Sequence, residues 1–185
     1  MISMIFAQPG RENTVEVAKA AVEAARAHGI GHIVVASSRG ETVRALPAHE
    51  GVGVVCVTHA FGYPKPGEME LPQTEREALE RAGVRVLTTS HVLSGAERGL
   101  SKKYGGIHPV EVIADTLRMF GAGTKVCVEV AVMALDAGLL PYGEPVVAVG
   151  GTARGADTAL ILTPAHASEI LNVKIHEYIC KPALY

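Results

Sequence analysis

The chain has 185 residues, of which 48% are hydrophobic and 19% are charged, and its formal net charge is -2 at pH 7. This length predicts a single domain, residues 1–185, that is large enough to bury a sizeable core. The small net charge argues against nucleic acid as a partner, because nucleic-acid binding calls for a basic surface. No apolar stretch is long enough to predict a membrane span, and the first ten residues lack a signal-peptide pattern. We therefore expect a cytoplasmic protein with no membrane partner.

Three cysteines lie far apart in the sequence, each in an apolar segment: Cys56, Cys127 and Cys180. An odd number of cysteines without CxxC spacing predicts neither a disulfide framework nor a structural zinc site. We expect three buried, reduced thiols, because a free cysteine packs like a small apolar side chain.

Short apolar runs alternate with amphipathic stretches along the chain. The runs predict strands, at residues 4–7, 32–36, 53–58, 84–89, 145–149, 158–162 and 173–180. The amphipathic stretches predict helices, at residues 13–28, 41–45, 73–82, 94–103, 109–120 and 124–137. Strands that are apolar throughout and alternate with helices predict an α/β fold with a mostly parallel sheet covered on both faces. The last run alternates between polar and apolar residues, which is typical of a half-exposed edge strand.

Residues 32–42 (HIVVASSRGET) combine a buried strand, a hydroxyl-rich turn and the start of a helix. Such a turn offers free backbone N–H groups at a helix N-terminus, where the helix dipole adds positive partial charge. We therefore interpret it as a phosphate site. Its candidate ligand-binding residues are Ser37, Ser38, Arg39, Gly40, Glu41 and Thr42. The simpler alternative is a capped helix after a tight turn, where Ser and Thr are common.

Residues 146–158 (VVAVGGTARGADT) again combine an apolar strand with a turn, and this turn contains more glycine. Glycine allows close backbone approach or positive φ. Arg154 is suited to neutralise a phosphate, and Asp157 to accept a hydrogen bond from a sugar hydroxyl or from a ring N–H of the ligand. The candidate binding residues are Gly150, Gly151, Thr152, Arg154, Gly155, Asp157 and Thr158. The alternative is a glycine-rich connection with a solvated Arg–Asp pair. Two such loops predict a phosphorylated small molecule as the partner.

His59 and His91 each follow a predicted strand. In mostly parallel sheets, ligands bind beyond the carboxyl ends of the strands, so both histidines are candidates for acid–base catalysis. The alternative for each is a histidine bonded to loop backbone. No HxH or HExxH spacing supports a metal site, and we expect none. Phe61 and Gly62, in the long loop after residue 58, are further candidate ligand contacts.

Lys125, Glu129 and Asp136 fall on one stripe of the predicted helix 124–137. A carboxylate among valines is either a buried acid with a raised pKa or part of a polar helix face. We favour the polar face and expect it, with Asp115 and Arg118 of the preceding helix, to serve helix or subunit contacts. These polar stripes and the edge strand predict a homo-oligomer.

Residues 33–42 resemble the effector-phosphate loop of the pyruvate kinase C-terminal domain, and residues 149–158 resemble its second, glycine-rich effector loop. Segments 89–91, 100–103, 113–120 and 132–138 fit the stand-alone archaeal and bacterial family of pyruvate kinase α/β-domain-like proteins. The chain is identified as a member of that family over nearly its full length.

The resemblance implies a three-layer α/β/α sandwich. Its sheet has the order 3-2-1-4-5, counted from the strand at 32–36, with the strand at 158–162 antiparallel. The resemblance also implies FMN as a cofactor of some members. Pyruvate kinase activity is not expected, because the chain has no barrel domain with metal-binding carboxylates and a catalytic lysine.

Three hypotheses for function follow. The first is an FMN-binding flavoprotein, acting as an oxidoreductase, with the phosphate at residues 37–42 and the ring near His59 and His91. The second is a non-catalytic sensor of a sugar phosphate or nucleotide, the regulatory role of the related kinase domain. The third is a structural assembly module.

Overall fold

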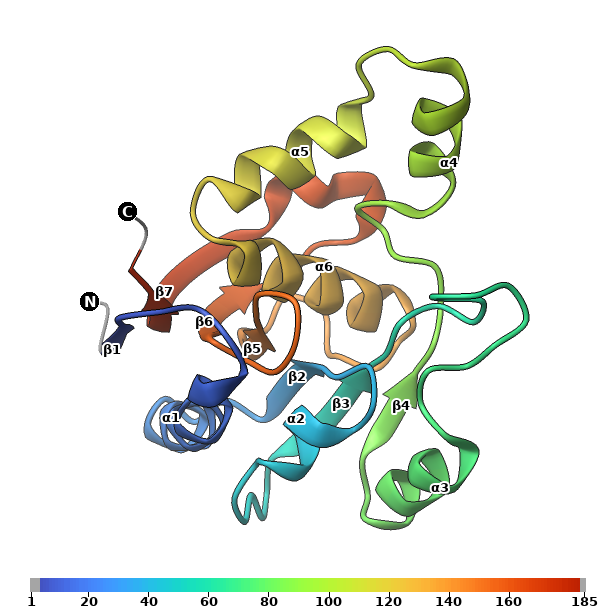
Figure 1. Ribbon diagram of the computed structural model, residues 1–185. Helices are drawn as coiled ribbons and strands as arrows, with labels where there is room; N and C mark the ends of the chain where they lie inside the picture. Colours follow the sequence, from blue (N-terminus) through green and yellow to red (C-terminus); the bar gives the residue numbers. More distant parts are fainter. Residues whose placement is uncertain (1–3, 184–185) are drawn as a thin grey trace.

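The computed structural model describes residues 4–183 and contains one seven-stranded sheet with helices on both faces (Figure 1). The strands are β1 (Met4–Phe6), β2 (His32–Ala36), β3 (Gly53–Val57), β4 (Arg85–Leu87), β5 (Val146–Gly150), β6 (Thr158–Thr163) and β7 (Lys174–Pro182). The α-helices are α1 (Thr14–Ala27), α2 (Glu41–Arg44), α3 (Gln73–Arg81), α4 (Gly95–Tyr104), α5 (Pro109–Arg118) and α6 (Ala122–Asp136). The two 3-10 segments are η1 (Arg11–Asn13) and η2 (Ala167–Asn172). All predicted helices and strands form, whereas the two 3-10 segments were not predicted.

The sheet has the order β1-β7-β6-β5-β2-β3-β4. Its part from β4 to β6 confirms the expected 3-2-1-4-5 order, and β6 is antiparallel to β5 as expected. The expected order is incomplete, because β7 adds to β6 and β1 adds to β7. β7 is therefore an edge strand over only part of its length, since β1 pairs in parallel with residues 180–182. A three-residue strand such as β1 carries too weak a pattern to predict its pairing.

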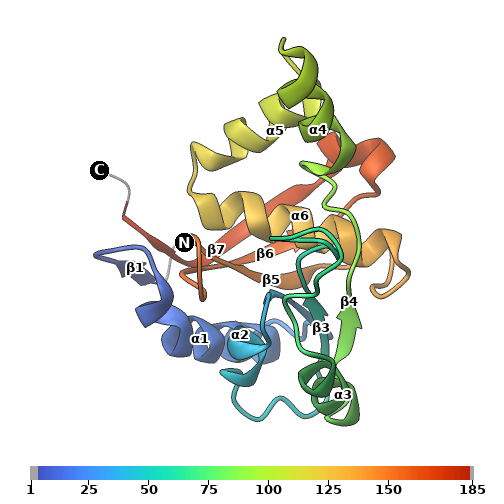
Figure 2. The same cartoon turned by 45° about the vertical axis from the view of Figure 1, so that its right-hand side comes forward.

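Alternating side chains of each central strand enter two separate cores, one on each face of the sheet. In β2, Ile33 and Val35 pack into the core beneath α1, whereas Val34 packs into the core beneath α6. All three are fully buried. Figure 2 shows α1 and α6 on opposite faces, with α5 stacked outside α6. This burial on both faces explains why the strands are apolar throughout.

α6 is buried along nearly its whole length, because it lies between the sheet and α5. Its apolar residues surround the helix rather than forming one stripe, as expected for a core helix. Two charged residues, Lys125 and Glu129, are buried with it. No helix within residues 4–183 is long and apolar enough to cross a membrane.

The loop between β5 and β6 packs tightly against the start of α1. Gly155 has a φ of 72°, and a Cβ at this position would lie 2.6 Å from the Cα of Arg11. The adjacent Ala156 N–H donates to Thr14 Oγ1 at 3.0 Å. Glycine at 155 thus meets two needs at once, a left-handed backbone and room for a neighbouring chain segment.

We expect Gly155→Ala to lower the free energy of unfolding by about 3 kcal/mol, combining left-handed strain with a backbone clash. Gly143→Ala is the matched control, because Gly143 has a φ of 79° and open space around its Cα. It should lose about 1–2 kcal/mol from the strain alone. Urea unfolding of both variants measures the difference, and equal losses would show that the close approach has no energetic consequence.

Candidate functional site

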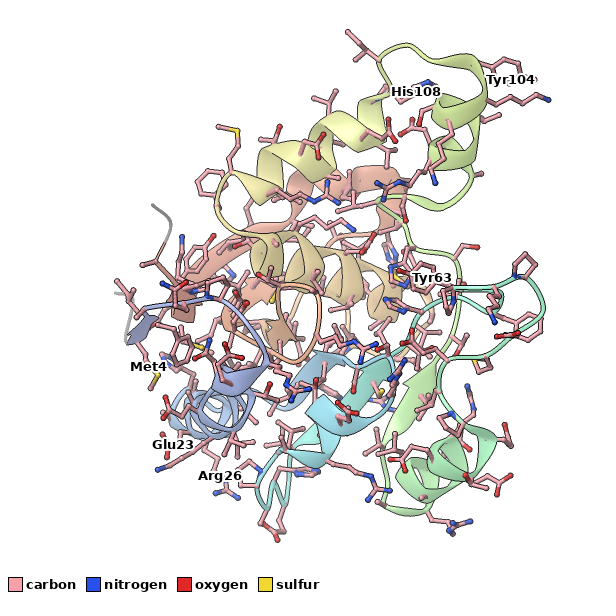
Figure 3. All side chains as sticks on the ribbon, viewed as in Figure 1. Met4, Glu23, Arg26, Tyr63, Tyr104 and His108 are labelled. Atoms are coloured by element: carbon pink, nitrogen blue, oxygen red, sulfur yellow. The ribbon has the colours of Figure 1, made fainter. Side chains whose placement is uncertain are left out.

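A cavity of about 530 Å³ lies at the carboxyl ends of β2, β3, β4 and β5. Its walls are formed by the segments that follow these strands and by the first half of α6. The side-chain view shows Tyr63 on the loop after β3, beside this opening (Figure 3). The cavity therefore lies at the carboxyl ends of the parallel strands, which is where ligands bind in open α/β folds.

The turn after β2 is fixed by its own side chains. The Ser37 hydroxyl oxygen accepts a hydrogen bond from the Thr42 N–H at 3.2 Å, so Ser37 closes the turn from inside. Gly40 has a φ of 87°, and a Cβ there would lie 2.7 Å from Glu75 Oε1. Glu75 is held in place by Arg44 of α2, whose Nη2 donates to it at 2.7 Å. The capped turn considered as an alternative is thus present, and it shapes the cavity wall.

The same turn carries free donors. Within residues 4–183, the N–H groups of Ser38, Arg39 and Gly40 donate to no protein acceptor. The helix that follows, α2, is only four residues long. Its summed dipole is therefore small and adds less to anion binding than the sequence predicts. The free N–H groups and the side chains of Ser38 and Arg39 are what this wall offers an anion.

His59 is anchored by a carboxylate. Its Nδ1 lies 2.6 Å from Glu70 Oε2, and the other oxygen of Glu70 accepts a hydrogen bond from Arg39 Nε at 3.1 Å. Burial would raise the pKa of Glu70, but the hydrogen bonds and positive charges of His59 and Arg39 outweigh it and lower that pKa. The His59 ring also meets Tyr63 edge-to-face, with 4.3 Å between ring centroids. The long loop after β3 is thereby tied to the turn after β2.

Glu129 of α6 is buried at the cavity wall, with a side chain only 2% exposed. Its Oε2 accepts from Lys125 Nζ at 2.6 Å and lies 3.1 Å from His91 Nδ1. Its Oε1 accepts from the Leu93 N–H at 3.0 Å. A buried carboxylate is tolerated only with such partners, and here they come from both α6 and the segment after β4.

His91 lies between two acceptors. Its Nδ1 faces Glu129 and its Nε2 lies 3.1 Å from the Thr58 carbonyl oxygen. Because neither acceptor can donate, both ring nitrogens must carry protons to satisfy both contacts, which makes the ring an imidazolium. Burial lowers the pKa of His91, but the Glu129 carboxylate outweighs it, and the net shift is upward. Burial likewise would raise the pKa of Glu129, yet the His91 hydrogen bond and the Lys125 charge lower it to about 2.

The prediction of a solvated polar face on α6 is wrong for Lys125 and Glu129, which form a buried ion pair facing the cavity. The buried-acid alternative is also wrong about the direction of the pKa shift, because the pKa of Glu129 is lowered and not raised. Asp136 accepts instead from His166 Nδ1 at 2.7 Å and from the Ala167 N–H. The spacing of charged residues along one helix cannot distinguish a solvated polar face from a buried ion pair, because the side of α6 that is buried depends on the segment after β4.

The glycine-rich loop is folded around Asp157. This carboxylate is fully buried and accepts hydrogen bonds from the N–H groups of Gly10 at 3.1 Å and Thr152 at 3.0 Å. It also accepts from the Thr158 hydroxyl at 2.8 Å. Asp157 and Thr158 therefore hold the loop in shape and do not face the cavity. Arg154 is exposed and lines it.

The structure brings most of the predicted residues together. Those that line the cavity are Ser37, Ser38, Arg39, Glu41, Thr42, His59, His91, Gly151, Arg154 and Gly155. Those outside its lining are Gly40, Phe61, Gly62, Gly150, Thr152, Asp157 and Thr158. Phe61 is 64% exposed, so its ring points to solvent.

Several lining residues carried no sequence motif. These are Tyr63, Arg98, Lys125 and Glu129. For Lys125 and Glu129 the sequence signal is a charged pair inside the valine-rich segment of α6, which by itself favours a polar face. For Tyr63 the signal is an aromatic residue in the long loop after β3. Positively charged side chains outnumber carboxylates in the cavity lining. The carboxylates are Glu41 and Glu129, and the cations are Arg39, Arg98, Lys125, Arg154 and the His91 imidazolium. No three His, Cys, Asp or Glu side chains in the described part of the chain are arranged to hold a metal ion.

The mostly parallel sheet with helices on both faces is the fold of a pyruvate kinase-type α/β domain. Residues 15–162, more than half of the chain, match the family described as "Pyruvate kinase, alpha/beta domain". The chain belongs to this family.

Solved structures similar to this chain are pyruvate kinases of Cryptosporidium parvum. One is 17% identical over 80% of this chain, with a TM-score of 0.41. A second, in complex with ADP, is 18% identical over 88% of this chain, also with a TM-score of 0.41. A third is 16% identical over 91%, with a TM-score of 0.38. The chain spans only 22–23% of the length of these enzymes.

The Glu129 cluster predicts a specific pH dependence of stability. The pKa of Glu129 is about 2 in the folded protein, below its ordinary value of 4.5. A lowered pKa contributes stability that is present above pH 4.5 and is lost as the pH falls toward 2. Glu129→Gln should lose about 3 kcal/mol at pH 7, because it leaves Lys125 without its counter-charge.

Urea unfolding from pH 7 down to pH 3 measures this effect. The difference between wild type and Glu129→Gln should shrink as the pH falls below 4.5. Glu97→Gln is the control, since Glu97 lies on α4 outside the cluster. Parallel curves for wild type and Glu129→Gln would contradict the charge assignment.

Proposed function

We propose that the protein binds a phosphorylated small molecule in this cavity and that FMN is that molecule. The observation that carries the proposal is the coincidence of free backbone donors at Ser38 and Arg39 with a surplus of cationic side chains around one cavity. Charge-assisted hydrogen bonds from backbone N–H and arginine are the strongest a phosphate receives in a protein. The cavity volume of about 530 Å³ is also within the range of small-molecule sites.

The chemistry of the lining suits FMN. Ser38, Arg39 and the backbone of the turn after β2 would hold the phosphate, with Arg154 on the facing loop. His59 and Tyr63 offer ring surfaces for a flat aromatic ligand. When bound, FMN would supply the electron chemistry of an oxidoreductase, while the chain supplies binding and electrostatics. Lys125 and the His91 imidazolium favour a ligand that carries or develops negative charge.

The visible absorption spectrum of the purified protein is the first test, followed by mass spectrometry of what heating releases. Flavin bands with the mass of FMN would support the proposal. A colourless protein that fails to bind added FMN would overturn the flavin assignment. Thermal stabilisation of that protein by a sugar phosphate or a nucleotide would then favour a sensor.

The phosphate site is tested by combining Ser38→Ala with Thr42→Ala. We expect FMN binding to weaken by about 1–3 kcal/mol, because charge-assisted hydrogen bonds to the phosphate are lost. Titration calorimetry with FMN and with riboflavin separates this effect from ring binding, since riboflavin lacks the phosphate and should bind both proteins alike. Thr74→Ala, on the exposed face of α3, is the matched control. Unchanged FMN affinity would place the phosphate elsewhere.

A further inference from the structure

The cavity contains two imidazoles in different hydrogen-bonding environments, 5.8 Å apart between ring centroids. Both nitrogens of His91 are engaged, by Glu129 and by the Thr58 carbonyl. His59 is engaged only at Nδ1, by Glu70, and within residues 4–183 its Nε2 has no protein partner. The His59 side chain is 37% exposed and lines the cavity. The two rings are therefore suited to different tasks.

Glu70 selects the tautomer of His59. Its carboxylate is ionised and can only accept, so neutral His59 must carry its proton on Nδ1 and keep a lone pair on Nε2. Arg39 holds the second oxygen of Glu70, which fixes the direction of the carboxylate. This is the arrangement by which a carboxylate orients a histidine base.

Positively charged side chains share the cavity with His59. Arg39, from the turn after β2, already partners Glu70. The His91 imidazolium, from the segment after β4, and Lys125, from α6, line the same cavity. Negative charge that develops on a ligand beside His59 would therefore have Lys125 and His91 in the same cavity to offset it.

We propose that His59 is the general base of this cavity and that Glu70 is its positioning residue, with a small molecule that carries an ionisable O–H or C–H proton as the substrate class. In the step, that O–H or C–H bond breaks and the proton bonds to His59 Nε2. The electron pair stays on the substrate as negative charge, which Lys125 and His91 offset. Glu70 stabilises the imidazolium that forms. The inference rests on the proposed function, because it requires a ligand in this cavity.

The tautomer is measured by long-range ¹H–¹⁵N NMR of the histidine rings at pH 8.5, with His59→Gln to assign the signals. We expect the His59 proton on Nδ1 in wild type and in Glu70→Gln, whose amide oxygen still accepts. Glu70→Ala should return the ring to the mixed tautomers of free histidine. Glu68→Ala, in the same loop but paired only with Lys65, should leave the tautomer unchanged.

Access of the lone pair to ligand is measured with diethyl pyrocarbonate, which attacks neutral imidazole nitrogen, followed by peptide mass spectrometry. FMN at ten times its Kd should slow modification of His59 about tenfold by mass action. His49, which is partly exposed and lies outside the cavity lining, should be modified at an unchanged rate.

A wild-type His59 proton on Nε2, or a tautomer unaffected by Glu70→Ala, would overturn the inference. So would FMN binding, shown by calorimetry, that leaves His59 unprotected. If FMN does not bind at all, the proposed function fails with this ligand, and the tautomer experiment alone decides the role of His59.

Discussion

The buried carboxylate of Glu129 is the constraint on which the site depends. A carboxylate that is almost fully removed from water must be compensated, and α6 alone supplies only Lys125. The remaining partners, His91 and the Leu93 N–H, belong to the segment after β4. Satisfying one charge therefore fixes α6 against that segment. The wall of the cavity, and the distance between His91 and His59, follow from this contact.

Two further carboxylates fix the neighbouring loops by accepting hydrogen bonds from separate segments of the chain. Glu70 joins the loop after β3 to the turn after β2 through His59 and Arg39. Asp157 joins the loop after β5 to Gly10, at the start of the chain. Each carboxylate gathers donors from segments that are distant in sequence. The cavity is thus shaped by polar contacts, while the apolar strands beneath it supply a rigid support.

Family membership establishes the fold but leaves the chemistry to be argued from the site. The chain spans less than a quarter of the length of the pyruvate kinases it resembles. Its own cavity combines fixed cations with one imidazole that has a free nitrogen. Such a combination is suited to holding an anion and moving a proton beside it. The proposed function and the role proposed for His59 both rest on this combination.

The sequence by itself determined the strands, the helices and the edge of the sheet that carries the site. Apolar periodicity is a local property, and the direction of parallel strands then places residues such as Ser38, His59 and His91 at one edge. The tertiary structure alone decided the pairing of β1 and β7 and the burial of Glu129. It also decided that Asp157 faces inward and that Arg98 faces the cavity. These outcomes depend on contacts between residues far apart in the chain, and such contacts cannot be predicted from the spacing of residues within one helix or loop.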